Sequence, residues 1–312
     1  MMLTIAIPTY NRIDQLNKVI SSLLPQINSN CRVVVIDNNS DISPLASSGF
    51  FKKNVDAGLI HYQKNKFNVG ADANIIKCIE LSDSDYTWVL GDDDIPDENA
   101  VKTIFQTVGD DPHSVFFNFS SDMFLRKKNI NGSGLNQFIQ AIDSFENMLF
   151  ISASVYKTKY IQENLRHAYE NCSSSMQNLS CLLSSLPDGS KFSLRKEKLV
   201  CWEPVHNGWD PLIITMRFFL ILDNLKTDAK HIRMLARKIR SGSASNKAII
   251  VNLIRKIISG QDKYRIRQMY GNYISRVYHY EFPLKLISHL YFSFLYLPIP
   301  VLKLLMSFKK NK

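Results

Sequence analysis

Short apolar runs and amphipathic helical segments alternate as far as residue 119, and this alternation constrains the fold more than any other feature of the sequence. Ile13, Leu16, Val19 and Ile20, for example, recur at the spacing of one helix face. Strands that alternate with helices predict an α/β fold in which a mostly parallel sheet is flanked by helices. The apolar runs predict buried strands at residues 3–8, 33–36, 59–64, 86–90 and 114–119.

Charge divides the chain unevenly. Residues 226–312 contain 18 Lys and Arg against three acidic residues, a net charge of +15, whereas the remainder contains 20 basic and 25 acidic residues, a net charge of −5. The pattern also becomes helical from residue 211 onward. We therefore expect two domains, an α/β domain at 1–210 and a helical, basic C-terminal region at 211–312.

Three polar clusters follow three of the predicted strands. They are 9–12 (Thr-Tyr-Asn-Arg), 37–39 (Asp-Asn-Asn) and 92–94 (Asp-Asp-Asp). Ligands of such sheets bind outside the carboxyl ends of the strands, so we expect the clusters to form one site. The first cluster supplies a hydroxyl from Thr9, an aromatic face from Tyr10 and a guanidinium from Arg12. The alternative for each cluster is an ordinary turn or helix cap.

The three adjacent aspartates carry the sharpest chemical signal. Adjacent carboxylates repel one another, so a folded chain tolerates them when they are solvated or bridged by a cation. Mg²⁺ and Mn²⁺ bind one or two carboxylates together with substrate phosphates. We expect Asp92 and Asp94 to face a similar side and to bind such an ion. The alternative is a solvated turn before the next helix.

The order of these segments resembles the family 2 glycosyltransferases of the GT-A fold. The matching segments are 5–12, 34–40, 68–74 and the aspartates, which resemble the family's DXD motif. The resemblance implies a nucleotide-diphosphate-sugar donor, with a UDP-sugar favoured, and a Mn²⁺ or Mg²⁺ cofactor. It also implies that a group of residues binds the nucleotide and metal, namely Pro8, Thr9, Tyr10, Arg12, Asp37, Asn39, Asn68, Gly70, Asp92, Asp93 and Asp94.

The sequence departs from the family where a general base is expected. Inverting members usually have an acidic pair before a late helix, but residues 173–178 read Ser-Ser-Ser-Met-Gln-Asn. A base must lie within hydrogen-bond reach of the acceptor hydroxyl. Glu170 and Asp210 are the candidates, and the assignment stays open between them. His206 is a candidate third metal ligand, with a plain loop histidine as the alternative.

Residues 282–312 are rich in apolar and aromatic side chains, yet they include Lys285, His289, Pro298, Pro300 and Lys303. These residues disfavour a simple spanning helix and favour an interfacial segment on an anionic membrane. The alternative is a C-terminal helix packed on the domain. We expect no nucleic-acid binding, because no recognition motif is present.

These features together predict a metal-dependent, inverting glycosyltransferase. Its acceptor would be a glycan or a lipid-linked glycan of cell-surface polysaccharide synthesis. We expect the protein to bind peripherally to the cytoplasmic face of the inner membrane. Two alternatives remain open. One is a sugar-phosphate nucleotidyltransferase, although the first strand is followed by no glycine-rich loop. The other is a catalytically silent membrane-surface adaptor of the same fold, suggested by the missing acidic pair.

Overall fold

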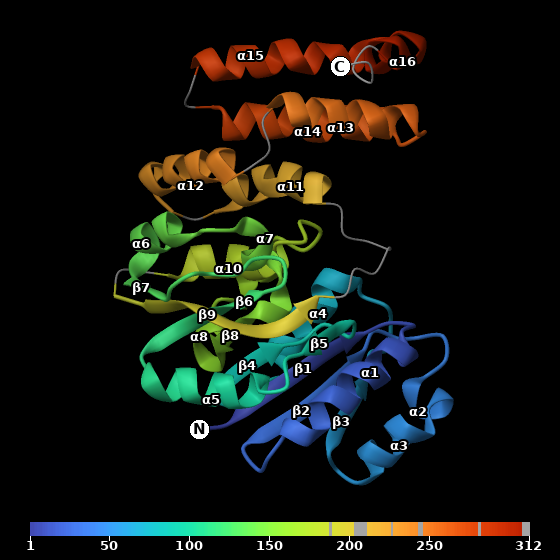
Figure 1. Ribbon diagram of the computed structural model, residues 1–312, viewed down its shortest axis with the longest axis vertical. Coiled ribbons are helices and arrows are strands. Elements are labelled where there is room, and N and C mark those ends of the chain that lie inside the picture. Colours follow the sequence, from blue (N-terminus) through green and yellow to red (C-terminus); the bar gives the residue numbers. More distant parts are fainter. Residues whose placement is uncertain (187–188, 203–210, 226, 243–245, 280–281, 308–312) are drawn as a thin grey trace. The chain divides into compact units, whose positions relative to one another are not determined.

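The computed structural model describes residues 1–186, 189–202, 211–225, 227–242, 246–279 and 282–307. The candidate residues His206 and Asp210 lie outside these ranges. The chain divides into two compact units, Met1–Gly208 and Trp209–Lys312. Figure 1 shows that the first unit contains the sheet and that the second consists of helices. The predicted α/β fold and the helical C-terminal region are both confirmed.

The first four predicted strands form the parallel half of the sheet, in the order β3-β2-β1-β4. β1 is buried along almost its whole length, and β2 combines three consecutive valines with Ile36, so both suit the centre of a sheet. The carboxyl ends of β1, β2 and β4 therefore meet at one edge. The bounds are β1 (Leu3–Thr9), β2 (Cys31–Asp37), β3 (Ile60–Lys64) and β4 (Tyr86–Val89).

The other half of the sheet is mixed, which differs from the mostly parallel sheet predicted. β6 pairs with β9 in parallel but with β8 antiparallel, and β8 lies antiparallel to β4. A short antiparallel strand, β5, continues directly from the aspartate cluster and pairs with β9. The bounds are β5 (Asp94–Pro96), β6 (Ser114–Ser121), β7 (Ile130–Ser133), β8 (Ser154–Lys157) and β9 (Lys191–Trp202).

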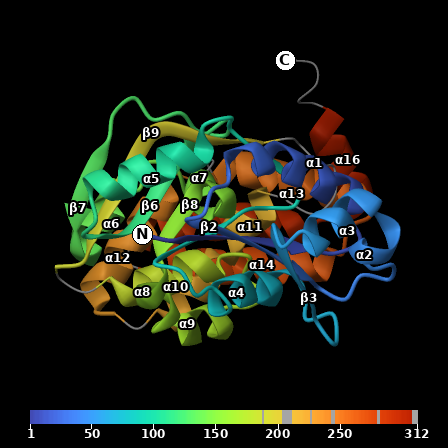
Figure 2. The same cartoon turned by 90° about the horizontal axis from the view of Figure 1, so that it is seen from below.

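Helices cover both faces of the sheet, with α1 and α5 on one face and α4, α8 and α10 on the other (Figure 2). The predicted face of α1 is confirmed, because Leu16, Val19, Ile20 and Leu23 are buried. The helices of this unit are α1 (Ile13–Leu23), α2 (Pro44–Ser47), α3 (Gly49–Asp56), α4 (Ala71–Glu80), α5 (Ala100–Asp110), α6 (Gly134–Ala141), α7 (Phe145–Leu149), α8 (Thr158–Gln162), α9 (Leu165–Glu170) and α10 (Gln177–Ser185), with 3-10 turns η1 (Leu24–Gln26) and η2 (Ile151–Ala153).

The second unit has a core of its own, in which α11 packs against α14, and α13 and α14 pack against α15. Within the described residues no lone helix is long and apolar enough to cross a membrane. One pair passes that test together, Lys285–Tyr296 with Ile299–Ser307, and it is bent by 113°. The helices are α11 (Pro211–Asn224), α12 (Ala229–Gly242), α13 (Asn246–Ile258), α14 (Lys263–Val277), α15 (Phe282–Ser293), η3 (Phe294–Tyr296) and α16 (Ile299–Ser307).

Candidate functional site

Hydrogen bonds join the loops that follow β1, β2 and β4. The N–H of Asn38 donates to the carbonyl of Thr9 at 2.8 Å, and the hydroxyl of Thr9 donates to Asp92 at 2.7 Å. Arg12 donates through Nη1 to Asp92 at 3.2 Å and to Asp93 at 2.7 Å. The three predicted clusters therefore form one arrangement at the carboxyl edge of the parallel half-sheet.

Asp92 and Asp94 are both buried, with 5% of each residue exposed, whereas Asp93 is half-buried. Burial raises the pKa of Asp92 to about 6, against the lowering effect of the Thr9 hydrogen bond and the Arg12 charge. Burial also raises the pKa of Asp94 to about 7, helped by the neighbouring charges of Asp93 and Asp92. The ionised carboxylates are thus under-compensated by the protein alone.

A serine that the sequence analysis missed fixes Asp94. Ser152, in η2 and fully buried, donates to Oδ2 of Asp94 at 2.5 Å. The same hydroxyl oxygen accepts from the N–H of Gly91 at 2.8 Å, and the carbonyl of Ser152 accepts from the indole of Trp88 at 2.8 Å. A side chain at position 91 would meet Asp94, since its Cβ would lie 2.4 Å from Oδ2. Gly91 therefore allows the aspartate to fold back over the end of β4.

Asp37 is fully buried and hydrogen-bonded to protein groups. Its Oδ1 accepts from the N–H and the hydroxyl of Ser40, and its Oδ2 accepts from the hydroxyl of Tyr62 at 2.7 Å. Burial is the largest of the effects that raise the pKa of Tyr62 to about 12. The Ser40 hydroxyl in turn accepts from the N–H of Asn11, so Asp37 holds the β2 loop against the β1 loop.

Two predicted nucleotide residues lie where β2 meets α4. The amide of Asn38 donates to Asn68 at 2.8 Å, and Asn68 also accepts from the N–H of Gly70 at 2.9 Å. Gly70 precedes α4 with φ of 85°, a backbone conformation that favours glycine. Behind them, Asn65 donates to both Asn38 and Asn74. This amide network fixes the loop and leaves Asn68 exposed.

Tyr10 is 40% exposed at the end of β1, next to half-buried Pro8. Asn11 and Asn39 both have left-handed backbones, with φ of 54° and 67°. The residue before α1 is Arg12, whose side chain caps no N–H group of the helix. Asn11 exchanges hydrogen bonds with Asp41, because its amide reaches across to the β2 loop.

Glu170, a candidate base, ends α9 and pairs with Arg166 one turn earlier at 2.8 Å. The stretch at 173–178 lies before and at the start of α10, and Ser173 and Ser175 have φ of 84° and 62°. A carboxylate does reach this stretch, because Oδ2 of Asp72 accepts from both serine N–H groups at 2.9 Å. The sequence did not predict this contact, because Asp72 lies in the first turn of α4, far from these serines along the chain.

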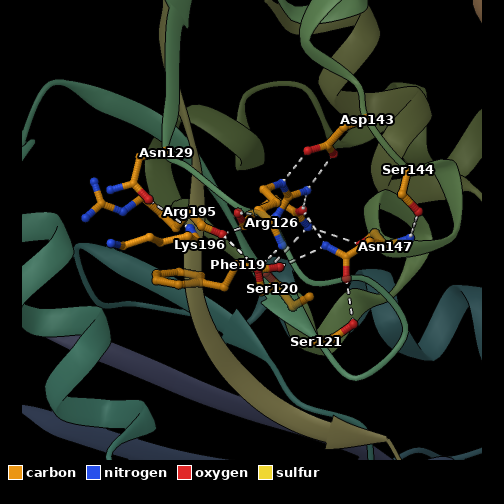
Figure 3. Close-up of polar contacts among 12 residues, drawn as sticks. Phe119, Ser120, Ser121, Arg126, Asn129, Asp143, Ser144, Asn147, Arg195 and Lys196 are labelled. Carbon is orange, nitrogen blue, oxygen red and sulfur yellow. Dashed lines mark hydrogen bonds and ion pairs between the residues drawn. The ribbon is translucent and has the colours of Figure 1, made fainter.

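An ion pair between buried Arg126 and solvent-exposed Asp143 lies beside the segment that carries Ser152. Arg126 donates to both carboxylate oxygens of Asp143, at 2.9 and 3.0 Å (Figure 3). It also donates to the side chain of Asn118. Asn118 also donates to Ser154 at 2.9 Å and exchanges hydrogen bonds with Asn147. β6, α7 and β8 are thereby tied together around η2.

The donor set at the aspartates fits a hard divalent cation. Asp92 and Asp94 supply carboxylate oxygens, and burial, which raises the pKa of both despite the charge of Arg12, makes their ionisation costly unless a cation is bound. Within the described ranges no group of three or more His, Cys, Asp or Glu side chains is placed to hold a metal ion. Two carboxylates are nonetheless the usual protein share when substrate phosphates complete the coordination of Mg²⁺.

Comparison with known proteins identifies relatives of this arrangement. The family model described as glycosyl transferase family 2 matches residues 4–154. A curated relative, abequosyltransferase RfbV of Salmonella typhimurium, is 28% identical over 118 residues, which are 37% of this chain and 35% of the relative. The match thus spans about a third of that relative's length.

Solved structures share the fold at low sequence identity. TarS 1–349 of S. aureus in complex with UDP-GlcNAc has a TM-score of 0.62 and 14% identity, covering 89% of this chain and 82% of that one. Its complex with UDP has a TM-score of 0.64 and 14% identity, covering 100% and 92%. Mannosyltransferase PcManGT of Pyrobaculum calidifontis, in complex with GDP-Man and Mn²⁺, has a TM-score of 0.54 and 10% identity, covering 94% and 84%. The predicted GT-A-like fold is confirmed.

Proposed function

We propose that this chain, which belongs to glycosyl transferase family 2 through its residues 4–154, is a metal-dependent glycosyltransferase that acts on a nucleotide-diphosphate sugar. The observation that carries the proposal is the convergence of Thr9, Arg12 and Ser152 on two buried aspartates. A turn that served only as a linker would have no need for three hydrogen-bond donors and two desolvated carboxylates at a strand end.

Each group has a role that follows from its position. Thr9 and Arg12 orient Asp92 through its two carboxylate oxygens, and Ser152 orients Asp94 through Oδ2, so that both carboxylates are held in fixed orientations. Asp92 and Asp94 would hold Mn²⁺ or Mg²⁺, which when bound supplies Lewis-acid stabilisation of the charge on the departing nucleoside diphosphate. The exposed ring of Tyr10 is available to stack on the base.

A UDP-sugar is the donor that we favour, and the complexes of the fold neighbour TarS with UDP-GlcNAc and UDP support this choice. The relative RfbV, an abequosyltransferase, supports sugar transfer as the reaction. The acceptor that we propose is a glycan or lipid-linked glycan of a cell-surface polysaccharide. We place the protein at the cytoplasmic face of the inner membrane, peripherally bound. We also retain an inverting mechanism.

The experiment incubates the purified chain with Mn²⁺ and a panel of nucleotide sugars, with and without lipid extract as acceptor. Release of nucleoside diphosphate from one donor, increased by the extract and lost in Asp94→Asn, supports glycosyl transfer. Release of pyrophosphate from a nucleoside triphosphate and a sugar phosphate would instead support nucleotidyl transfer. Binding without turnover of any donor would support the silent adaptor.

A further inference from the structure

An apolar surface runs along α15, η3 and α16. Leu290 and Leu304 are 61% and 57% exposed, and seven other large apolar side chains between residues 286 and 305 are also exposed. We call this set the apolar ridge. Single exposed leucines are ordinary, but many large exposed apolar side chains on successive elements favour an interaction surface. The ridge consists of Leu286, Ile287, Leu290, Phe294, Tyr296, Ile299, Val301, Leu304 and Leu305.

The same elements are anchored to the second unit by their opposite side. Leu295 and Leu302 are fully buried, and Ser288 is buried as well. The ridge is therefore a surface of folded structure and not an unpacked tail. The segment thus packs on its unit through some side chains, as the alternative in the sequence analysis expected, while other apolar side chains stay exposed.

A single arginine fixes the bend between the two helices. Arg267, on α14, donates through Nε and Nη2 to the carbonyl of Leu295 at 2.9 and 2.7 Å. Its guanidinium also lies over the ring of Tyr296, 4.4 Å from the centroid. Pro298 and Pro300 follow the bend and disfavour a continuous helix through it. The 113° angle is thus held by specific contacts as well as by sequence.

Basic side chains accompany the ridge. Lys285 lies at its start and exposed Lys303 within it, and the wider segment 226–312 has 18 basic against three acidic residues. An apolar stripe bordered by lysines matches an anionic bilayer, whose headgroups attract the charges while its acyl boundary takes the leucines. A second copy of this chain would place its own basic segment against this one, and the like charges would repel.

We propose that the apolar ridge docks in the plane of an anionic lipid bilayer without crossing it. Crossing the hydrocarbon core takes about 20 residues in one straight segment, whereas α15 and α16 are short and fixed at a steep angle. The inference deepens the proposed function, since it names the surface that would meet a lipid-linked acceptor. Vesicle binding is nevertheless measured without any sugar transfer. Membrane docking and the proposed glycosyltransferase activity are therefore tested independently.

The experiment floats the full chain on vesicles of phosphatidylcholine alone and on vesicles in which about one third of the lipid is phosphatidylglycerol. The double variant Leu290→Glu/Leu304→Glu places two charges on the ridge. The matched control is Leu125→Glu, because Leu125 is 65% exposed in the first unit. Equal far-UV circular dichroism of all three proteins shows that they are folded.

We expect wild type and the control to float with the anionic vesicles and the double variant to bind at least about tenfold less. Alkaline carbonate should release the bound protein. Failure of the wild type to float, equal binding by the double variant, or resistance to carbonate would each overturn the proposal. Light scattering that showed a dimer in wild type and a monomer in the double variant, without vesicle binding, would assign the ridge to a second copy.

Discussion

The hydroxyl of Ser152 donates a 2.5 Å hydrogen bond to Asp94 and accepts one from the N–H of Gly91. Because the backbone N–H occupies the hydroxyl oxygen, the serine proton is directed at the carboxylate. Oδ2 of Asp94 is thereby held, and the other oxygen is left as the one to bind a cation. Residues behind a metal ligand commonly set its orientation in this way.

Replacement of Ser152 by alanine should weaken Mn²⁺ binding in the presence of UDP by about 10- to 100-fold. The fully buried Ser154 provides a matched control, because it bonds with Asn118 and lies two residues away. Ser154→Ala should bind Mn²⁺ as wild type does. Electron paramagnetic resonance of free Mn²⁺ measures the Mn²⁺ affinity of each variant. Equal affinities of the two variants would remove Ser152 from the site.

Metal binding should strengthen as the pH rises through about 6 to 7, the pKa values of Asp92 and Asp94. Both pKa values lie above the value of 3.8 that applies to the unfolded chain. The two groups therefore stabilise the metal-free fold most below pH 3.8, and this stabilisation is lost as the pH rises through 6 to 7. The rise in unfolding temperature caused by Mn²⁺ should therefore be larger at about pH 8 than at about pH 5.

A thermal-shift series in buffers that do not bind metal checks this dependence. Asp94→Asn cannot ionise at that position and should show a smaller, flatter Mn²⁺ effect across the series. An Mn²⁺ effect in wild type that did not change with pH would mean that these carboxylates are not the ligands.

Asp72 should act by positioning the loop before α10. It bonds the N–H groups of Ser173 and Ser175, whose left-handed backbones need such support. Asp72→Asn keeps an acceptor oxygen and should retain most of the activity, whereas Asp72→Ala should lower kcat at least about tenfold, because a misplaced loop costs productive geometry. Steady-state kinetics with a fixed donor separates the two. Loss of activity in Asp72→Asn as severe as in Asp72→Ala would indicate a chemical role for the carboxylate.

Loss of the carboxylate that pairs with buried Arg126 should destabilise the first unit. Asp143→Ala leaves a guanidinium that is 1% exposed without its carboxylate, and the free energy of unfolding should fall by about 3 kcal/mol. Lys52→Ala removes one member of an exposed ion pair with Asp56 and should change the free energy of unfolding by less than about 0.5 kcal/mol. Urea denaturation measures both, and equal effects would contradict the distinction.

The parallel half of the sheet could be predicted because its strands are uninterrupted apolar runs. β9 escaped prediction, since Lys191–Trp202 contains a charged stretch, Arg-Lys-Glu-Lys, that masks any strand pattern. β5 has three residues, too few to show a period. Their pairing depends on contacts between distant segments, such as Ile95 with Cys201, which no local pattern encodes. The sheet was accordingly expected to be more parallel than it is.

The site was predictable where its residues directly follow strands, as Thr9 and Asp92 do. Ser152 and Tyr62 were missed because a single serine or tyrosine within other structure has no sequence signature. Asp72 was missed for the same reason, although it stands in the segment 68–74, which carries part of the family resemblance. These supporting residues become visible only when the fold brings distant segments together.

Calorimetric titration of UDP into the protein, with and without Mn²⁺, tests the central claim most directly. If the strand-end aspartates hold a cation that binds the diphosphate, wild type should bind UDP far more tightly with Mn²⁺ present, and Asp94→Asn should lose that gain. Equal UDP affinity with and without Mn²⁺ in wild type, or an undiminished gain in Asp94→Asn, would contradict the account.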